Sequence, residues 1–114
     1  MFFQRKTRAI PKPWVTSVSE ILKRGSRSEI EWTNQGFGRW HFYGTRLEAY
    51  EAMLKAFAEP NIIGKNIRMP IDEGETYAFF FTAKNEQMYG KICLTHDRQK
   101  IIIYSAHKAE KDQL

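Results

Sequence analysis

The residues best suited to chemistry lie in two apolar segments near the C-terminus, and both segments alternate as β-strands do. In residues 88–95, Tyr89 and Lys91 fall on one side of the alternation. In residues 100–106 and the histidine that follows, the same alternation places on one side Ile101, Ile103, Ser105 and His107. If the two strands are neighbours, one surface presents a phenol, an ammonium, a hydroxyl and an imidazole.

This set of side chains suits RNA cleavage without a metal ion, in which the ribose 2′-hydroxyl attacks the adjacent phosphate. Histidine titrates near neutrality, so His107 is the candidate general acid or base. Lysine can stabilise the negative charge that develops on the phosphate, which is the role predicted for Lys91. The alternative interpretation is that these residues are half-exposed strand positions with ordinary partners.

The motifs indicate no other chemistry. His41, His96 and His107 are not spaced as metal ligands, so neither a metal nor another cofactor is expected. No Walker motif, GxGxxG or GxSxG occurs, which leaves nucleotide hydrolysis, dinucleotide chemistry and serine esterase chemistry without support. Cys93 stands alone in an apolar run and is predicted to be a small buried residue.

An aromatic region over residues 29–44 supplies a second group of candidates. Alternation and the turn sequence of residues 34–38 predict a β-hairpin. Its second strand places Arg39, His41 and Tyr43 on one side, where they could stack on unpaired bases and contact phosphate. The other side, predicted to face the core, carries Trp40 and Phe42.

Two helices are predicted from capping residues and periodicity. Ser17 begins a capping box and Gly25 supplies a stop, which predicts a short helix over residues 18–24. Thr45 begins a second capping box, and the amphipathic helix behind it ends before Pro60. The apolar face of this helix is predicted to consist of Leu47, Tyr50, Met53, Leu54, Phe57 and Ala58.

The chain beyond this helix reads as a sheet. Short polar breaks of hairpin-loop length separate the strand segments, which favours a four-stranded antiparallel meander. The predicted segments are residues 62–63 with 66–71, then 76–83, 88–95 and 100–106. The predicted fold class is therefore α+β: a short N-terminal helix, a β-hairpin, an amphipathic helix and then the meander.

Length and charge set the remaining expectations. The chain has the size of a single domain over residues 1–114. Its 18 Lys and Arg against 13 Asp and Glu give a net charge of +5, which suits a polyanionic partner. Residues 1–13, ending in Pro-Lys-Pro, are predicted to form an extended basic arm in which Arg5, Lys6 and Arg8 contact nucleic acid. No signal peptide or membrane-spanning stretch is recognised, so a cytoplasmic location and no membrane contact are expected.

The passage Ala58–Gly64, the strands after it and the run Tyr104-Ser105-Ala106-His107 carry a family resemblance. Over residues 45–109 the chain resembles the barnase, colicin and RelE-like group of small ribonuclease domains, in particular its divergent phage-associated branch. In that group a helical segment precedes a meander whose sheet carries the active site. The resemblance assigns to the active site Tyr89, Lys91, Arg98, Ser105 and His107.

The leading prediction is an RNA-directed domain of phage or toxin type that acts as a metal-independent ribonuclease. His107 is the general acid or base, and Lys91 with Arg98 holds the scissile phosphate. Two alternatives remain open: a nucleic-acid-binding protein that cuts nothing, and a protein-interaction module of a mobile element, such as an immunity, inhibitor or accessory protein. RNA is the expected partner, a protein inhibitor or partner is the alternative, and the oligomeric state is not predicted.

Overall fold

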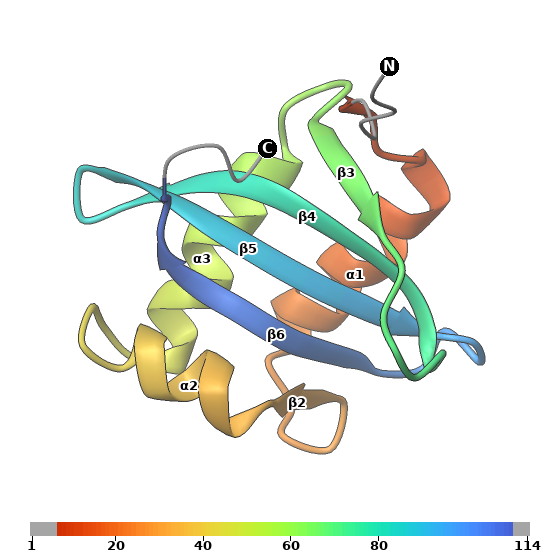
Figure 1. Ribbon diagram of the computed structural model, residues 1–114, viewed down its shortest axis with the longest axis horizontal. Helices are drawn as coiled ribbons and strands as arrows, with labels where there is room; N and C mark the ends of the chain where they lie inside the picture. Colours follow the sequence, from red (N-terminus) through yellow and green to blue (C-terminus); the bar gives the residue numbers. More distant parts are fainter. Residues whose placement is uncertain (1–6, 111–114) are drawn as a thin grey trace.

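The computed structural model describes residues 7–110 and shows three helices packed against a six-stranded sheet (Figure 1). The helices are α1 (Lys12–Arg24), α2 (Asn34–Trp40) and α3 (Arg46–Phe57). The strands are β1 (Arg8–Ala9), β2 (Ile30–Trp32), β3 (Ile63–Ile67), β4 (Gly74–Ala83), β5 (Glu86–Thr95) and β6 (Ile101–Lys108). The predicted α+β class is confirmed.

The sheet is larger than the predicted meander. Its strand order is β1-β3-β4-β5-β6-β2, and every neighbouring pair from β3 to β6 is antiparallel. At the outer edges, β1 pairs with β3 antiparallel and β2 pairs with β6 in parallel. Three of the predicted strands correspond to β4, β5 and β6, and the first predicted strand overlaps β3 only in part. The prediction that four strands form the whole sheet is wrong. Two short segments from earlier in the chain extend the centre on both sides.

The helices α1 and α3 cover one face of this sheet. In Figure 1, α1 and α3 lie together behind the central strands, while α2 lies beside β6. The core between helices and sheet contains fully buried side chains from every layer, among them Trp14, Val18, Trp40, Met53, Phe79, Ile92 and Ile103. We call the opposite side of β4, β5 and β6 the open face. Within residues 7–110, no helix has the length and apolar character needed to cross a membrane.

The predicted hairpin over residues 29–44 is wrong. Only Ile30–Trp32 forms a strand, and the supposed turn sequence begins α2. The Thr33 side chain caps this helix by accepting a hydrogen bond of 3.0 Å from the Gly36 N–H. Gly36 also lies so close to β6 that an added Cβ would meet the Ile103 carbonyl oxygen at 2.8 Å. The glycine thus serves close packing of helix on strand, and not a turn.

The first helix begins earlier than predicted. It starts at Lys12, with Pro13 in its first turn, where the missing proline N–H would have no helical partner anyway. Ser17 therefore lies inside the helix, and the predicted cap at that position is wrong. The expected arm over residues 1–13 is also wrong in its second half, because β1 and α1 occupy it. The stop at Gly25 is confirmed, with φ of +61°.

The predicted amphipathic helix is confirmed as α3. Its capping box is complete: the Thr45 hydroxyl accepts from the Glu48 N–H at 3.1 Å, and the Glu48 carboxylate accepts from the Thr45 N–H at 2.9 Å. The buried face differs in part from the predicted one. It consists of Ala49, Tyr50, Met53 and Phe57. Leu47, which is 61% exposed, and Ala58 lie outside it.

Candidate functional site

A bulge in the β5–β6 pair decides which predicted residues reach the open face. Lys91 pairs with Ser105, whereas the next residue of β5 pairs with Ile103. Tyr104 is therefore an extra residue in β6. The bulge divides the four residues that were predicted to share one side: Ile101 and Ile103 lie in the core, and Ser105 and His107 lie on the open face. That prediction of a common side is wrong, because strict alternation does not survive an inserted residue.

The open face contains a pocket of about 230 Å³ between α2, β5, β6 and the loop that joins β3 to β4. We call it the open-face pocket, and its lining residues are Thr33, Gln35, Arg39, Met69, Lys91, Tyr104, Ser105 and His107. Strand pairing places Lys91 opposite Ser105 and Tyr89 opposite His107. The structure thus brings together four of the five residues predicted to be catalytic.

His107 contributes the imidazole of the pocket, and imidazole is the side-chain group that most often transfers protons in catalysis. His107 is 5% exposed, and its ring lies against the ring of Tyr89, with the two centroids 5.4 Å apart. The Nδ1 atom is 2.9 Å from the Lys108 carbonyl oxygen. Because a carbonyl oxygen only accepts, Nδ1 must donate, and the neutral ring then carries its lone pair on Nε2. The imidazole is therefore held in the tautomer that a general base at Nε2 requires.

Two tyrosines beside His107 keep their protons at neutral pH. Burial raises the pKa of Tyr89 above its ordinary value. The pKa of Tyr104 is raised to about 12, mainly by burial and also by the negative charge of Glu73. Both phenols therefore keep a hydrogen to donate over the whole neutral range. Tyr104 lines the pocket, and its hydroxyl donates to the Glu73 carboxylate at 3.4 Å.

The open-face pocket is electropositive. Lys91 and Arg39 both line it, and among the residues in the described part of the chain no Asp or Glu does. Arg39 does form an ion pair next to it, with its Nη2 atom 2.8 Å from the Glu110 carboxylate. This contact lowers the pKa of Glu110. Arg39 is thus paired with a carboxylate at the rim, whereas Lys91 lines the pocket. The positive charge of Lys91 favours binding of an anionic group there.

Arg98 is not part of this site. It lies in the turn between β5 and β6, with φ of +61°, at the end of the strands away from His107. Its Nη2 atom donates to the Pro13 carbonyl and to the Ser17 hydroxyl, both at 2.9 Å. The prediction that Arg98 holds a phosphate with Lys91 is therefore wrong. The side chain instead joins this turn to α1 on the helix-covered side.

The predicted nucleic-acid contacts are separated. Arg39 lines the pocket from α2. The His41 ring instead stacks on Phe37, with the centroids 5.7 Å apart, and lies tilted against Phe42, with the centroids 4.1 Å apart. Tyr43 is half-buried against the core tryptophan of α2. The three residues share no strand side, because the segment is helical up to Trp40. Arg39 is the only member of this predicted trio that reaches the pocket.

The basic residues predicted for the N-terminal arm do not add to the described pocket. Arg5 and Lys6 lie outside the described residues. Arg8 belongs to β1, at the edge of the sheet furthest from β6 and the pocket.

Among the residues that the structure describes, no group of three or more His, Cys, Asp or Glu side chains could hold a metal ion. Cys93 is buried, as predicted, and burial raises the pKa of its thiol.

Sequence reasoning missed several pocket residues. Thr33 and Gln35 are not predicted as site residues because the sequence of their segment indicates a hairpin. A helical reading would have placed Gln35 and Arg39 one turn apart on a common side, with Thr33 as the cap. Met69 comes from a loop that folds back over the sheet, and no local signal marks it.

No protein-family model, curated protein or solved structure matches this chain. The resemblance to small ribonuclease domains stays a prediction. The pocket combines one imidazole of fixed tautomer, the Tyr104 phenol that keeps its proton, and one cation, Lys91, beyond the Arg39–Glu110 ion pair.

Proposed function

We propose that this protein binds RNA at the open-face pocket and cleaves it without a metal ion. The observation that carries the proposal is the juxtaposition of His107 with Lys91 and Arg39 in one pocket. An imidazole and two cations are the groups needed to move a proton and to stabilise charge on phosphate. A volume of about 230 Å³ suits a phosphate with part of a ribose more than a complete drug-sized ligand.

The proposed step uses residues that line the pocket. The His107 Nε2 takes the proton from the ribose 2′-hydroxyl as its oxygen forms a bond to phosphorus. Lys91 and Arg39 stabilise the charge on the non-bridging oxygens. The bond from phosphorus to the 5′-oxygen breaks, and this oxygen takes the proton of the Tyr104 hydroxyl, which gives up its 3.4 Å hydrogen bond to Glu73. The products are a 2′,3′-cyclic phosphate and a 5′-hydroxyl, and the imidazolium later returns its proton to the phenolate through water.

Cleavage of single-stranded RNA in EDTA tests this proposal. We expect the wild-type protein to produce fragments that end in a cyclic phosphate. His107→Asn keeps an amide N–H near the position of Nδ1 but removes Nε2, and it should lower the cleavage rate at least roughly 100-fold. Lys91→Met should also slow cleavage. Lys23→Met, which removes an exposed cation from α1 on the other side of the sheet, is the matched control and should cleave normally.

A second function, RNA binding without cleavage, is favoured by one observation. Only 5% of His107 is exposed, which restricts the approach of a ribose hydroxyl to Nε2. In that case RNA would be retained in a salt-sensitive manner by wild-type protein, more weakly by Lys91→Met, and no cyclic phosphate would form. Absence of both cleavage and retention would contradict an RNA-directed function.

A further inference from the structure

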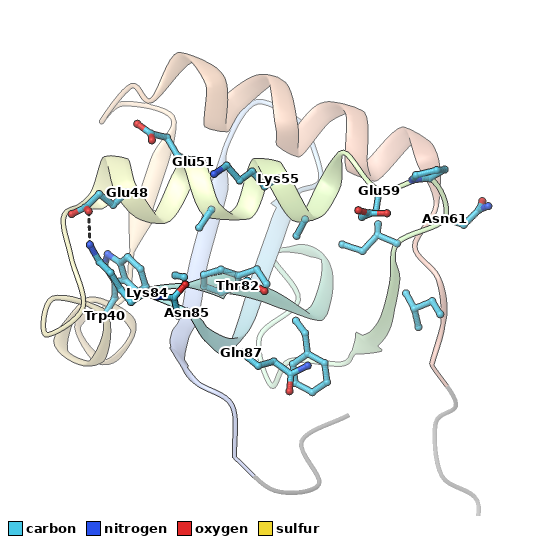
Figure 2. Close-up of a pocket in the computed structure, with 18 residues that line it drawn as sticks. Trp40, Glu48, Glu51, Lys55, Glu59, Asn61, Thr82, Lys84, Asn85 and Gln87 are labelled. Atoms are coloured by element: carbon cyan, nitrogen blue, oxygen red, sulfur yellow. Dashed lines mark hydrogen bonds and ion pairs between the residues drawn. The ribbon is translucent and has the colours of Figure 1, made fainter.

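A second hollow lies away from the open-face pocket, between α3 and the β4–β5 hairpin. Its volume is about 830 Å³, and we call it the α3–hairpin groove. Figure 2 shows Glu51 and Lys55 along α3 and Glu59 just beyond its end, with Thr82 and Asn85 across the groove from them. The groove is thus bounded by a helix on one side and by the end of a strand on the other.

The strand at this groove has an unpaired edge. The pairing between β3 and β4 ends where Gly64 meets Phe79, but β4 continues to Ala83. Within residues 7–110, no strand pairs with residues 80–83 on the side of β3. An edge of this kind presents backbone N–H and C=O groups that can accept a further strand.

The hairpin turn shows which backbone groups point outward. Lys84 and Asn85 have φ of +53° and +61°, as a two-residue type I′ turn requires. Ala83 and Glu86 close this turn as the pair that exchanges hydrogen bonds, so the preceding residue, Thr82, directs its N–H and C=O away from β5. These two groups of Thr82 face the groove.

The groove also offers side-chain contacts in the alternation that a strand needs. On the α3 side, Ala52, Ala56 and Ala83 give an apolar floor. On the other side, Thr82 and Gln87 are exposed. A strand added along β4 would therefore direct every second side chain onto the apolar floor beneath α3.

Charge distinguishes between possible occupants. The rim carries Glu48, Glu51, Glu59, Lys55 and Lys84, and Glu48 is already paired with Lys84 at 2.6 Å. The two remaining carboxylates exceed the single remaining ammonium, in a chain whose net charge is +5. Local acidity repels RNA phosphate. It also opposes pairing of this edge with a second copy, because a two-fold axis would bring the same carboxylates together.

We propose that the α3–hairpin groove binds an extended, basic peptide segment of a partner protein, which adds a strand to the free edge of β4. Backbone hydrogen bonds to Thr82 set the register of the peptide. Lys or Arg side chains of the peptide lay their methylene groups on Ala52 and Ala56 and reach Glu51 and Glu59 with their charged ends. This site is separate from the open-face pocket and does not depend on RNA binding.

A random peptide library displayed on phage tests this proposal with the full-length protein as bait. We expect enriched peptides to alternate basic or apolar residues with polar ones, without proline at the pairing positions. Thr82→Pro removes the outward N–H and leaves the pairing with β5 intact, so it should weaken synthetic copies of these peptides at least about tenfold, or about 1.4 kcal/mol. Thr82→Ala, which keeps the N–H, is the matched control and should bind with the affinity of the wild type.

Reversal of charge gives a second measurement that does not alter the backbone. Glu51→Lys together with Glu59→Lys should abolish selection of basic peptides and leave the circular dichroism spectrum unchanged. The proposal is overturned if no peptide is enriched, if the enriched peptides bind Thr82→Pro as well as Thr82→Ala, or if they are acidic. Because RNA cleavage by Thr82→Pro should stay normal, failure here is distinguishable from failure of the proposed ribonuclease function.

Discussion

At the scale of single residues, one inserted residue creates the candidate site. Residues 105 and 107 have the parity of the core residues 101 and 103, so a regular β6 would direct His107 into the core. Tyr104 takes up the extra position in the bulge, and the strand changes sides. Bulges near sites commonly re-aim side chains in this way. Here the bulge moves an imidazole from an apolar interior to a pocket that holds Lys91.

Two tyrosines should make stability fall at alkaline pH. The pKa values of Tyr77 and Tyr104 are raised to about 12, mainly by burial, against about 10 in an unfolded chain. Between these pH values the unfolded state has lost protons that the folded state keeps, so the free energy of unfolding decreases as pH rises from about 10 toward 12. Urea denaturation across this range, with tyrosinate absorbance recorded in parallel, measures the decrease.

The variants Tyr77→Phe and Tyr104→Phe serve as the control for this prediction. Each removes one titrating phenol and keeps the ring, so the alkaline loss of stability should become shallower in both. A slope in both variants equal to that of the wild type would contradict the assignment to Tyr77 and Tyr104.

For the catalytic candidates, alternation in the sequence predicts correctly only part of which side chains share a face of the sheet. Tyr89 and Lys91 share a side as predicted, because β5 remains regular up to the bulge. Ser105 and His107 share a side with each other, but the prediction that Ile101 and Ile103 lie on that same side is wrong. Arg98 could not be placed by alternation, since it lies in a turn whose direction depends on the docking of α1.

At the scale of elements, α2 depends on one glycine for its packing and could do without another. A Cβ on Gly36 would meet the carbonyl oxygens of Ile103 and Tyr104 at 2.8 and 2.9 Å, and these backbone atoms cannot move cheaply. A Cβ on Gly38 would meet nothing within 4 Å. We therefore expect Gly36→Ala to destabilise the protein by roughly 1–3 kcal/mol. Gly38→Ala should stabilise it by up to about 1 kcal/mol, because alanine favours the helix.

The two alanine variants are controls for each other, since they add the same methyl group to the same short helix. Urea denaturation gives the free energy of unfolding for both. If Gly36→Ala were as stable as Gly38→Ala, the close approach of α2 to β6 would be contradicted. Loss of stability in both variants would instead indicate that the segment is not helical.

The same helix marks the limit of element prediction from this sequence. The capping box at Thr45 involves residues three positions apart, so α3 was recognised with its correct start. For α2, Gly36 and Gly38 have the local character of a turn, and their helical role depends on the distant strand β6. The outer strands β1 and β2 are two and three residues long, and only their partners in the sheet make them strands.

At the scale of the whole molecule, two surfaces of different charge lie on the same sheet. The open-face pocket has Lys91 and Arg39 among its lining residues, and the α3–hairpin groove has an excess of carboxylates. This separation fits a basic molecule that engages a polyanion at one place and a basic segment at another. The proposed RNA and peptide would then approach different sides of the molecule and would not exclude each other by charge.

The two sites should therefore behave independently in one protein. Gln87, the strand partner of Thr82, is four residues from Lys91 along β5, or about 13 Å. Sites at such separation usually contribute additively. Lys91→Met should weaken RNA binding up to about fivefold, or about 1 kcal/mol, and leave the selected peptide unaffected. Thr82→Pro should do the reverse, and the double variant should show both losses unchanged in titrations with each ligand. A peptide affinity that changes with saturating RNA would contradict this independence.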